Sequence, residues 1–500
     1  MAILPETKTG EARRNCAENL PWLLGLFLIG LAAKFQLIHK YSSSLPYMDQ
    51  WSSEVHELFV PWFNHQFSLA ALFEAHNEHR IVFTRLSELG LLSANGRWDN
   101  RLEITFNAVL HAAAIAGFAW LMISLLGKRV RPWLWTLLVL DLVLPFAWEN
   151  TLWGFQSQFY FLQIFSVLTI WLLGLSEPLS FRWWCGVACA VLSLFTMASG
   201  FFAAVVVMGI VLVDVWKQRQ NWRRHLPTIV VCIGLMAAGW LLKPDVLEDH
   251  QYQAHSAGEF LTALGKNLAW PWATKPFYAS FNLLPLVLLA WMHFRFASEN
   301  AGGERMVLGV GFWVILQALA VAYARGVGGI APAWRYMDVL SFLMIANGLS
   351  IWLLLTRYGV RLKFPVLWQA GFALWAVCCL GGLYYLSERA WAKYIPDFAL
   401  EQQKQLESAR AFLATDDVHV LLNRPPVQLI AGNIDEVVWF LRNPMIRQIL
   451  PACARDAIPS TDSKLAGQKE GWLSNCAMQM LRGWKFFLGA GLLSLAYGAI

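Results

Sequence analysis

Residues 20–38 read LPWLLGLFLIGLAAKFQLI, an apolar run long enough to cross the hydrocarbon core of a bilayer as a helix. No small-residue cleavage site follows it, which favours a retained span over a removed signal peptide. Further runs of spanning length lie at about 105–126, 132–148, 158–175, 182–197, 200–216, 227–243, 279–294, 306–323, 338–356, 366–386 and 484–500. We therefore predict an all-α polytopic membrane protein with about twelve transmembrane helices.

The composition supports this class. Apolar residues make up 57% of the chain and charged residues only 14%, whereas a soluble domain carries roughly 25% charged residues. The 27 Trp suit anchors at membrane interfaces. The net charge of +6 comes mostly from short basic loops between spans, so it predicts no nucleic-acid partner. The sequence contains no Gly-rich phosphate loop, zinc-type Cys pair or dinucleotide fingerprint.

The distribution of Lys and Arg predicts the orientation. If the N-terminus lies in the cytoplasm, the short cytoplasmic loops hold thirteen Lys and Arg residues. The short external loops hold only four, although together they contain more residues. We expect a cytoplasmic tail at 1–19, a transmembrane domain at 20–386, an external subdomain at 387–482 and a final span at 483–500. The first external loop, about 39–104, is the densest polar segment, and we expect it to hold the site.

Two clusters in this loop contain candidate catalytic and binding side chains. Tyr47-Met48-Asp49-Gln50-Trp51 places a carboxylate just outside the first span, next to an amide and an indole. Asp49 is our candidate general base, because a carboxylate in this position can remove a proton from a hydroxyl. Gln50 and Trp51 are candidate substrate-binding neighbours. Residues 51–63 and 81–92 show helical spacing and are expected to lie along the membrane surface, with a turn at Asn95-Gly96.

The second cluster is His76-Asn77-Glu78-His79-Arg80, followed by Arg85. Its guanidiniums suit a phosphate, and its imidazoles could donate hydrogen bonds to the same group. A divalent cation held by the His residues with Asp49 or Glu78 is the alternative, and Glu78 is a second candidate catalytic carboxylate. An interfacial loop that only anchors headgroups is the third possibility. We expect the His76 cluster to share one cavity with Asp49, approached by Arg325 or Arg335.

Two later external segments supply the remaining candidates. Polar groups beside aromatic rings are what a sugar requires, and Glu149, Asn150 and Gln156 stand among Trp and Phe residues. The Gly-rich stretch from Arg325 to Arg335 and Tyr336 allows close backbone approach and offers two guanidiniums to a lipid phosphate. An aromatic belt with snorkelling Arg explains part of the same pattern.

The segment 387–482 reads as a small α+β unit. Residues 398–415 and 433–442 are predicted helices, and 418–422 a short strand. Cys453 and Cys476 are the two Cys that lie outside both the spans and the cytoplasmic tail. Because the external face is oxidising, we predict a disulfide between them, worth roughly 3 kcal/mol through loop closure.

The motifs Asp49-Gln50-Trp51, His76 to Arg80, Trp153 to Gln156, Arg325 to Tyr336 and Asn443 to Pro451 resemble a poorly characterised bacterial branch of the GT-C superfamily. These are integral-membrane glycosyltransferases that use polyprenyl-phosphate-linked sugars. The resemblance covers most of the chain in architecture and short motifs in sequence. It implies that Asp49, the acid of the first loop, is catalytic. The chain departs from the pattern because no second acidic residue stands beside Asp49. The resemblance therefore leaves open whether a divalent metal is a cofactor.

We therefore expect an inverting glycosyltransferase of the bacterial inner membrane. It would move a sugar from a polyprenyl-phosphate donor to an envelope glycan or lipid acceptor on the external face, among membrane lipids. A transporter or flippase for lipid-linked glycans is the main alternative. It would place a cavity at the bilayer midplane, whereas a transferase would place one at the outer leaflet, lined by loop 39–104. A non-catalytic scaffold would leave the Asp49 and His76 clusters unexplained.

Overall fold

The computed structural model describes residues 6–217, 222–244, 246–296, 301–359, 365–459 and 471–499. Within these ranges the chain is helical and contains no β-strand. Seven helical segments are long and apolar enough to cross a membrane: Glu18–Tyr41, Asn100–Leu126, Lys128–Leu152, Trp222–Leu242, Ala301–Ala324, Trp334–Arg357 and Pro365–Thr415. They agree with a multi-pass membrane protein.

The prediction of twelve spans is confirmed only in part. The other predicted runs also form helices, but these are shorter or less apolar than the seven: α7 (Ser157–Leu172), α8 (Phe181–Ser193), α9 (Phe202–Lys217), α12 (Tyr278–Arg295) and α22 (Trp484–Ala499). The residues Ala198, Ser199 and Gly200 lie between α8 and α9.

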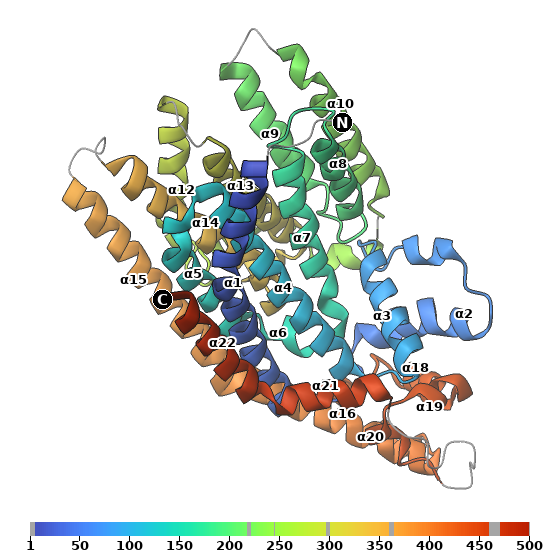
Figure 1. The fold of residues 1–500 in the computed structure, drawn as a ribbon. Coiled ribbons are helices and arrows are strands. Elements are labelled where there is room, and N and C mark those ends of the chain that lie inside the picture. Colours follow the sequence, from blue (N-terminus) through green and yellow to red (C-terminus); the bar gives the residue numbers. More distant parts are fainter. Residues whose placement is uncertain are drawn as a thin grey trace.

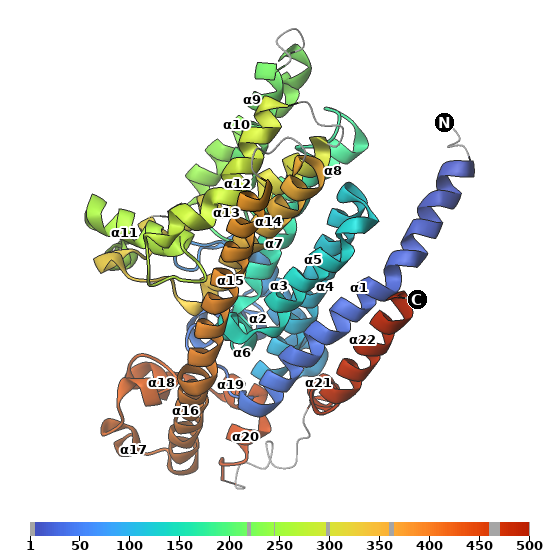
Figure 2. The same cartoon turned by 90° about the vertical axis from the view of Figure 1, so that its left-hand side faces the viewer.

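Most long helices pack side by side in one bundle (Figures 1 and 2). Its helices are α1 (Glu6–Tyr41), α4 (Asn100–Leu126), α5 (Arg131–Val143), α10 (Trp222–Leu242), α13 (Ala301–Ala324), α14 (Met337–Arg357) and α15 (Pro365–Arg389). Nearly all of α14 is buried between its neighbours. Helix α22 lies along α1, which brings the last helix beside the first. The helix containing the predicted tail begins at Glu6, and residues 1–5 lie outside the described range.

The loop between α1 and α4 folds at one end of the bundle. It contains the π-helix η1 (Gln50–Phe59), α2 (Val60–Phe63), η2 (Leu69–Phe73) and α3 (Val82–Asn95). The two helices predicted in this loop are therefore confirmed. Helix α3 ends at Gly96, whose φ of 67° is left-handed. Glycine adopts this conformation without steric cost, which explains the predicted turn.

The C-terminal segment packs against this loop at the same end of the bundle (Figure 1). One hydrophobic core contains side chains of both: Leu45, Trp51, Val55, Leu58, Phe59 and Trp98 from the loop, and Phe412, Leu413, Leu421, Phe440 and Leu441 from the C-terminal segment. Across this core the ring of His56 stacks on Trp439 with centroids 4.1 Å apart. The segment therefore fixes the first loop from the side facing away from the bundle.

The α+β character predicted for 387–482 is wrong for the described residues. Helices α16 (Ile395–Thr415) and α18 (Ile434–Arg442) confirm the two predicted helices, but 418–422 contains a short helix, α17 (His419–Leu422). The remaining helices are α19 (Pro444–Ile449), α20 (Ala452–Arg455) and α21 (Trp472–Arg482). The predicted boundary at 386/387 falls inside a helical run, because α15 continues through a π-helical turn into α16.

Candidate functional site

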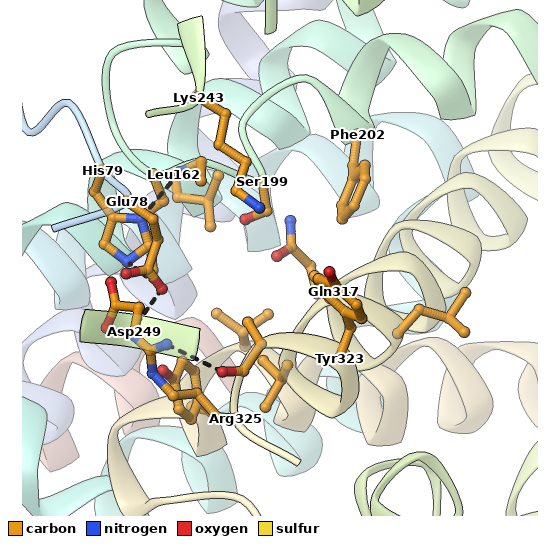
Figure 3. A pocket seen from close by; sticks show the side chains of 18 of the residues that line it. Glu78, His79, Leu162, Ser199, Phe202, Lys243, Asp249, Gln317, Tyr323 and Arg325 are labelled. Carbon is orange, nitrogen blue, oxygen red and sulfur yellow. Dashed lines mark hydrogen bonds and ion pairs between the residues drawn. The ribbon is translucent and has the colours of Figure 1, made fainter. Parts of the chain in front are cut away.

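A cavity of about 500 Å³ lies at the end of the bundle that carries the first loop. Its walls come from the start of α7, the turn before α9, and the ends of α10 and α13 that face this loop, together with the start of α14. Two residues of the first loop, Glu78 and His79, complete one side (Figure 3). The cavity thus joins the membrane helices to the loop in which the sequence places the site.

The interior of this cavity is mostly apolar. Its walls include Phe159, Leu162, Phe202, Val339 and Leu340. On the rim, Trp240 of α10 is 73% exposed and Tyr323 of α13 is 51% exposed. Both helices are long and apolar enough to span a membrane. Exposed aromatic residues at the ends of such helices are typical of membrane interfaces.

The polar groups of the cavity gather around one guanidinium. Arg325 Nη2 lies 2.7 Å from Glu78 Oε1 and 3.3 Å from Asp249 Oδ1 (Figure 3). The same guanidinium lies over the ring of Tyr252, 5.5 Å from its centroid. Glu78 and Arg325 were both predicted site residues, and the structure brings them together. Asp249 joins them from the loop between α10 and α11 (Ala257–Leu268).

Burial alone would raise the pKa of Glu78, but His79, the hydrogen bond with Asp249 and the Arg325 guanidinium lower it to about 2. Burial also lowers the pKa of His79, to about 4, so this imidazole is neutral near pH 7. The cation that keeps Glu78 ionised at that pH is therefore Arg325. Glu78 is held as a carboxylate, and its negative charge is already balanced inside the cavity wall.

One hydrogen bond fixes the tautomer of His79. The backbone N–H of Ala198 donates to His79 Nδ1 at 3.2 Å. Because a backbone N–H can only donate, Nδ1 must be the acceptor of the neutral ring, and the proton resides on Nε2. This nitrogen lies 3.9 Å from Glu78 Oε1, too far for a hydrogen bond.

Asp49 lies in a second polar cluster, outside the cavity walls. Burial raises its pKa, while the nearby His76 and Arg335 lower it and Glu57 raises it further. Burial is the largest of these effects. Asp49 is thus a partly buried carboxyl group with two basic side chains close to it, an arrangement suited to a general base.

Two short connections join the clusters. His76 and His79 exchange backbone hydrogen bonds of 2.8 and 3.0 Å, so one tight turn places His76 near Asp49 and His79 in the cavity. Similarly, Arg335 faces Asp49 while the adjacent Tyr336 lines the cavity. Of the residues expected to share one cavity, Glu78 and His79 line it, whereas Asp49 lies beside it together with His76. The structure shows two neighbouring clusters connected at these residues.

Arg80 and Arg85 are not placed to hold a phosphate. Arg80 donates to the carbonyl oxygens of Leu242 (2.9 Å) and Phe73 (2.5 Å). Arg85 is fully buried and donates to carbonyls within residues 71–74. Carbonyls of the first loop and of the end of α10 engage these guanidiniums, and Arg85 also pairs with the carboxylate of Glu57, so their donors are used to shape the loop.

Gln50 and Trp51 also have structural roles. Gln50 Oε1 accepts from the N–H of Tyr47 at 2.9 Å, and Gln50 Nε2 donates to Glu103 at 2.7 Å. Trp51 is 1% exposed and donates to the carbonyl of Pro46 at 2.9 Å. Both side chains lie in the interior of the loop, where they fix the backbone next to Asp49.

Glu149 and Asn150, two of the residues predicted to contact a sugar, lie against the backbone of Arg335. The backbone N–H of Arg335 donates to Glu149 Oε2 at 3.0 Å, and the backbone carbonyl of Arg335 accepts from the side chain of Asn150 at 2.8 Å. Gln156 is buried, 2% exposed. Asn77 is exposed with a φ of 49°, a left-handed conformation that Asn tolerates in the turn between the two His residues. Glu149 and Asn150 are thus positioning residues.

Sequence reasoning missed Lys243 and Asp249, which both line the cavity. The sequence could have pointed to Lys243, because this residue ends the apolar run 227–243 on the side predicted to be external, where Lys is uncommon. Asp249 left none, since a single acid in a polar loop is usually solvated.

Two further predictions concern metal and disulfide. In the described ranges no group of three or more His, Cys, Asp and Glu side chains could hold a metal ion. Cys453 and Cys476 do not form the predicted disulfide. They lie on different helices: α20 packs against α16, whereas Cys476 is exposed on α21, which packs against α1 and α4. Residues 460–470, expected to close that loop, lie outside the described range.

Comparison with known proteins gives no relative. No family model matches the chain, and no curated protein matches it.

Proposed function

We propose that this protein is a membrane glycosyltransferase that uses a polyprenyl-phosphate-linked sugar. The observation that carries the proposal is the form of the cavity. Its body is apolar and is lined in part by the exposed Trp240 and Tyr323, and its polar groups include Lys243, Arg325 and His79. A lipid with an isoprenoid tail and a phosphate head requires both parts, and it can enter from the membrane without leaving it.

The charge pattern of the loops supports a position on the external face of a bacterial inner membrane, with the N-terminus in the cytoplasm. Nucleotide sugars are absent there, so a lipid-borne sugar is the available donor. The acceptor would be an envelope glycan or lipid that approaches from the outside, where Asp49 is partly exposed. The likeness of the short motifs to GT-C enzymes supports the same assignment.

The reaction would be a single displacement. Asp49 takes the proton of an acceptor hydroxyl, and that oxygen attacks the anomeric carbon. The bond between this carbon and the phosphate oxygen breaks, and the polyprenyl phosphate leaves with the electron pair. Cationic and hydrogen-bond-donating groups at the polar end of the cavity stabilise the departing phosphate in a mostly apolar surrounding. The anomeric configuration is inverted.

The position of the cavity favours a transferase over a flippase. A transporter for lipid-linked glycans needs a site that both faces can reach in turn, near the middle of the spanning helices. This cavity lies at the helix ends and includes Glu78 and His79 of the first loop. Such a position suits chemistry at one face.

The test is the glycan profile of a bacterial strain lacking the gene. We expect one envelope glycan or lipid to lose the mass of one sugar, and complementation with the wild type to restore it. Complementation with Asp49→Asn should not restore it, although the variant is inserted at the wild-type level. Loss of the whole glycan from the envelope, with the complete lipid-linked glycan accumulating in the inner leaflet, would point to the flippase instead, and an unchanged profile would contradict the proposal.

A further inference from the structure

The cavity contains two side chains that are cationic at neutral pH, and they differ in what already holds them. Arg325 Nη1 donates to the carbonyl of Ala324 at 3.0 Å, and Nη2 contacts both Glu78 and Asp249. Its face covers the ring of Tyr252. A guanidinium with two carboxylates beside it has its charge neutralised and its donors engaged, so it offers little to an incoming anion.

Lys243 is different. Among the residues that the structure describes, no carboxylate lies within ion-pair distance of its ammonium group, which stands 5.9 Å from the ring centroid of Tyr323. Its side chain points into the cavity toward Ser199 (Figure 3). The Lys243 side chain is exposed, so its ammonium group, which has no carboxylate partner in the described ranges, is accessible to an anion that enters the cavity.

His79 offers a second donor. Its Nδ1 accepts from the Ala198 N–H, so the proton is on Nε2, and no side chain described lies close enough to accept it. The imidazole is neutral and therefore keeps this donor over the whole neutral pH range. The turn before α9 thus sets the tautomer of a residue in the first loop.

We propose that Lys243 and the Nε2–H of His79 together hold the phosphate of the lipid in this cavity, whereas Arg325 fixes Glu78 and Asp249 in place. The inference rests on the proposed function for the identity of the lipid alone. It reverses the assignment that the sequence favours, in which the Arg residues bind the phosphate. It makes Lys243 and His79 positioning residues for the leaving group.

The test is lipid binding by the full-length protein in a non-phosphate detergent, followed by native mass spectrometry. The probes are undecaprenyl phosphate, the neutral alcohol undecaprenol, phosphatidic acid and inorganic phosphate. Lys243→Met should weaken undecaprenyl phosphate binding by roughly tenfold or more, since one charge-assisted contact is lost. It should leave undecaprenol binding unchanged. Lys275→Met, at an exposed lysine outside the cavity walls, is the matched control.

Two substitutions of His79 separate its two nitrogens. The amide of Gln reaches the position of Nε2 and can donate there, whereas Asn places an acceptor near Nδ1 and has no donor at Nε2. We expect His79→Gln to bind undecaprenyl phosphate within about threefold of the wild type and His79→Asn to bind at least about tenfold more weakly. His255→Asn, at an exposed His, should have no effect.

The outcomes discriminate between the two proposals. Wild-type affinity in Lys243→Met, or equal binding by His79→Gln and His79→Asn, would overturn the inference while leaving the glycosyltransferase proposal standing. Binding of phosphatidic acid that requires Lys243, without binding of undecaprenyl phosphate, would support the inference and remove the proposed substrate. Equal competition by inorganic phosphate would identify a free anion as the ligand of the same two residues. Failure of every phosphate probe to bind would overturn the inference.

Discussion

Arg325 Nη2 lies 2.7 Å from Glu78 Oε1, an ion pair that joins the end of α13 to the first loop. Neither side chain is more than about a fifth exposed, at 19% for Arg325 and 11% for Glu78. The pair therefore does two things. It closes the polar end of the cavity, and it connects the loop holding Asp49 to the membrane helices.

The first prediction concerns this pair. Arg325→Gln should lower the free energy of unfolding by about 1–3 kcal/mol, because Glu78 is left as a partly buried carboxylate without its guanidinium. Glu78→Gln/Arg325→Gln should be less destabilised than the sum of the two single variants. The measurement is the Tm of the purified protein in detergent. Glu177→Gln breaks the exposed pair with Arg224 and should leave Tm unchanged. Additive effects at Glu78 and Arg325 would show that the pair does not couple the two elements.

The second prediction concerns Glu88, a buried residue of α3. Burial raises its pKa from 4.5 to about 8, although Arg85 opposes the shift. Because the folded pKa is the higher one, its contribution to stability is fully present below about pH 4.5 and is lost as the pH rises through about 8. We expect the free energy of unfolding to fall by about 2–4 kcal/mol over this interval, and the Tm to fall with it.

Glu88→Gln tests the assignment, because it removes the titration. Its Tm should depend less on pH, and its advantage over the wild type should grow between pH 5 and pH 8. A wild-type Tm that rises with pH in this window, or a variant with the same slope, would contradict it. Glu436→Gln, at an exposed position of α18, should keep the wild-type slope.

The third prediction compares two glycines. A Cβ on Gly154 would lie 2.3 Å from Glu103 Oε2 and 2.9 Å from both Asn100 and Gln50, whereas a Cβ on Gly90 would meet nothing within 4 Å. Gly154→Ala should therefore destabilise the protein by about 1–3 kcal/mol through overpacking. Gly90→Ala, in the interior of α3, should stabilise it by about 0.5–1 kcal/mol. Thermal unfolding of the two variants side by side checks this. A harmless Gly154→Ala would mean that the hydrogen bonds around this turn are loosely held.

The sequence predicted the helical fold because apolar runs of spanning length leave few alternatives. It also predicted α16, α18 and the turn at Gly96, all of which depend on local patterns. The prediction failed at 418–422, where a β-branched and apolar stretch folds as α17. Packing of Leu421 into the core shared with the first loop outweighs the local preference there.

From the sequence, only the loops that contain the candidate site were predictable, and not the contacts that its side chains make. Glu78, His79, Arg325 and Tyr336 meet at one cavity, as their shared polarity and predicted side of the membrane suggested. The uses of Arg80 and Arg85 were not predictable, because the carbonyls that engage them, from the folded loop and from the end of α10, are brought to them only by folding. The same holds for the role proposed for Lys243, which depends on the carboxylates that surround Arg325 and are absent around Lys243 in the described ranges.

The fourth prediction concerns Asp49 and tests the central claim. Asp49→Asn removes the proposed base while keeping nearly the same shape, so transfer should fall by at least about a hundredfold. Because burial raises the pKa of Asp49, the activity of the wild type should be lost on acidification at a higher pH than an ordinary Asp would require. Asp435→Asn, at an exposed position of α18, is the control and should retain full activity.

The most direct measurement incubates the purified wild type, Asp49→Asn and Asp435→Asn with a panel of undecaprenyl-phosphate sugars and envelope extracts as acceptor. Release of undecaprenyl phosphate and the glycosylated product are quantified by mass spectrometry. We predict release of undecaprenyl phosphate matched by product formation with the wild type and Asp435→Asn, and neither with Asp49→Asn. Wild-type turnover by Asp49→Asn would contradict the proposed base, and no turnover of any donor by the wild type would contradict the glycosyltransferase assignment itself.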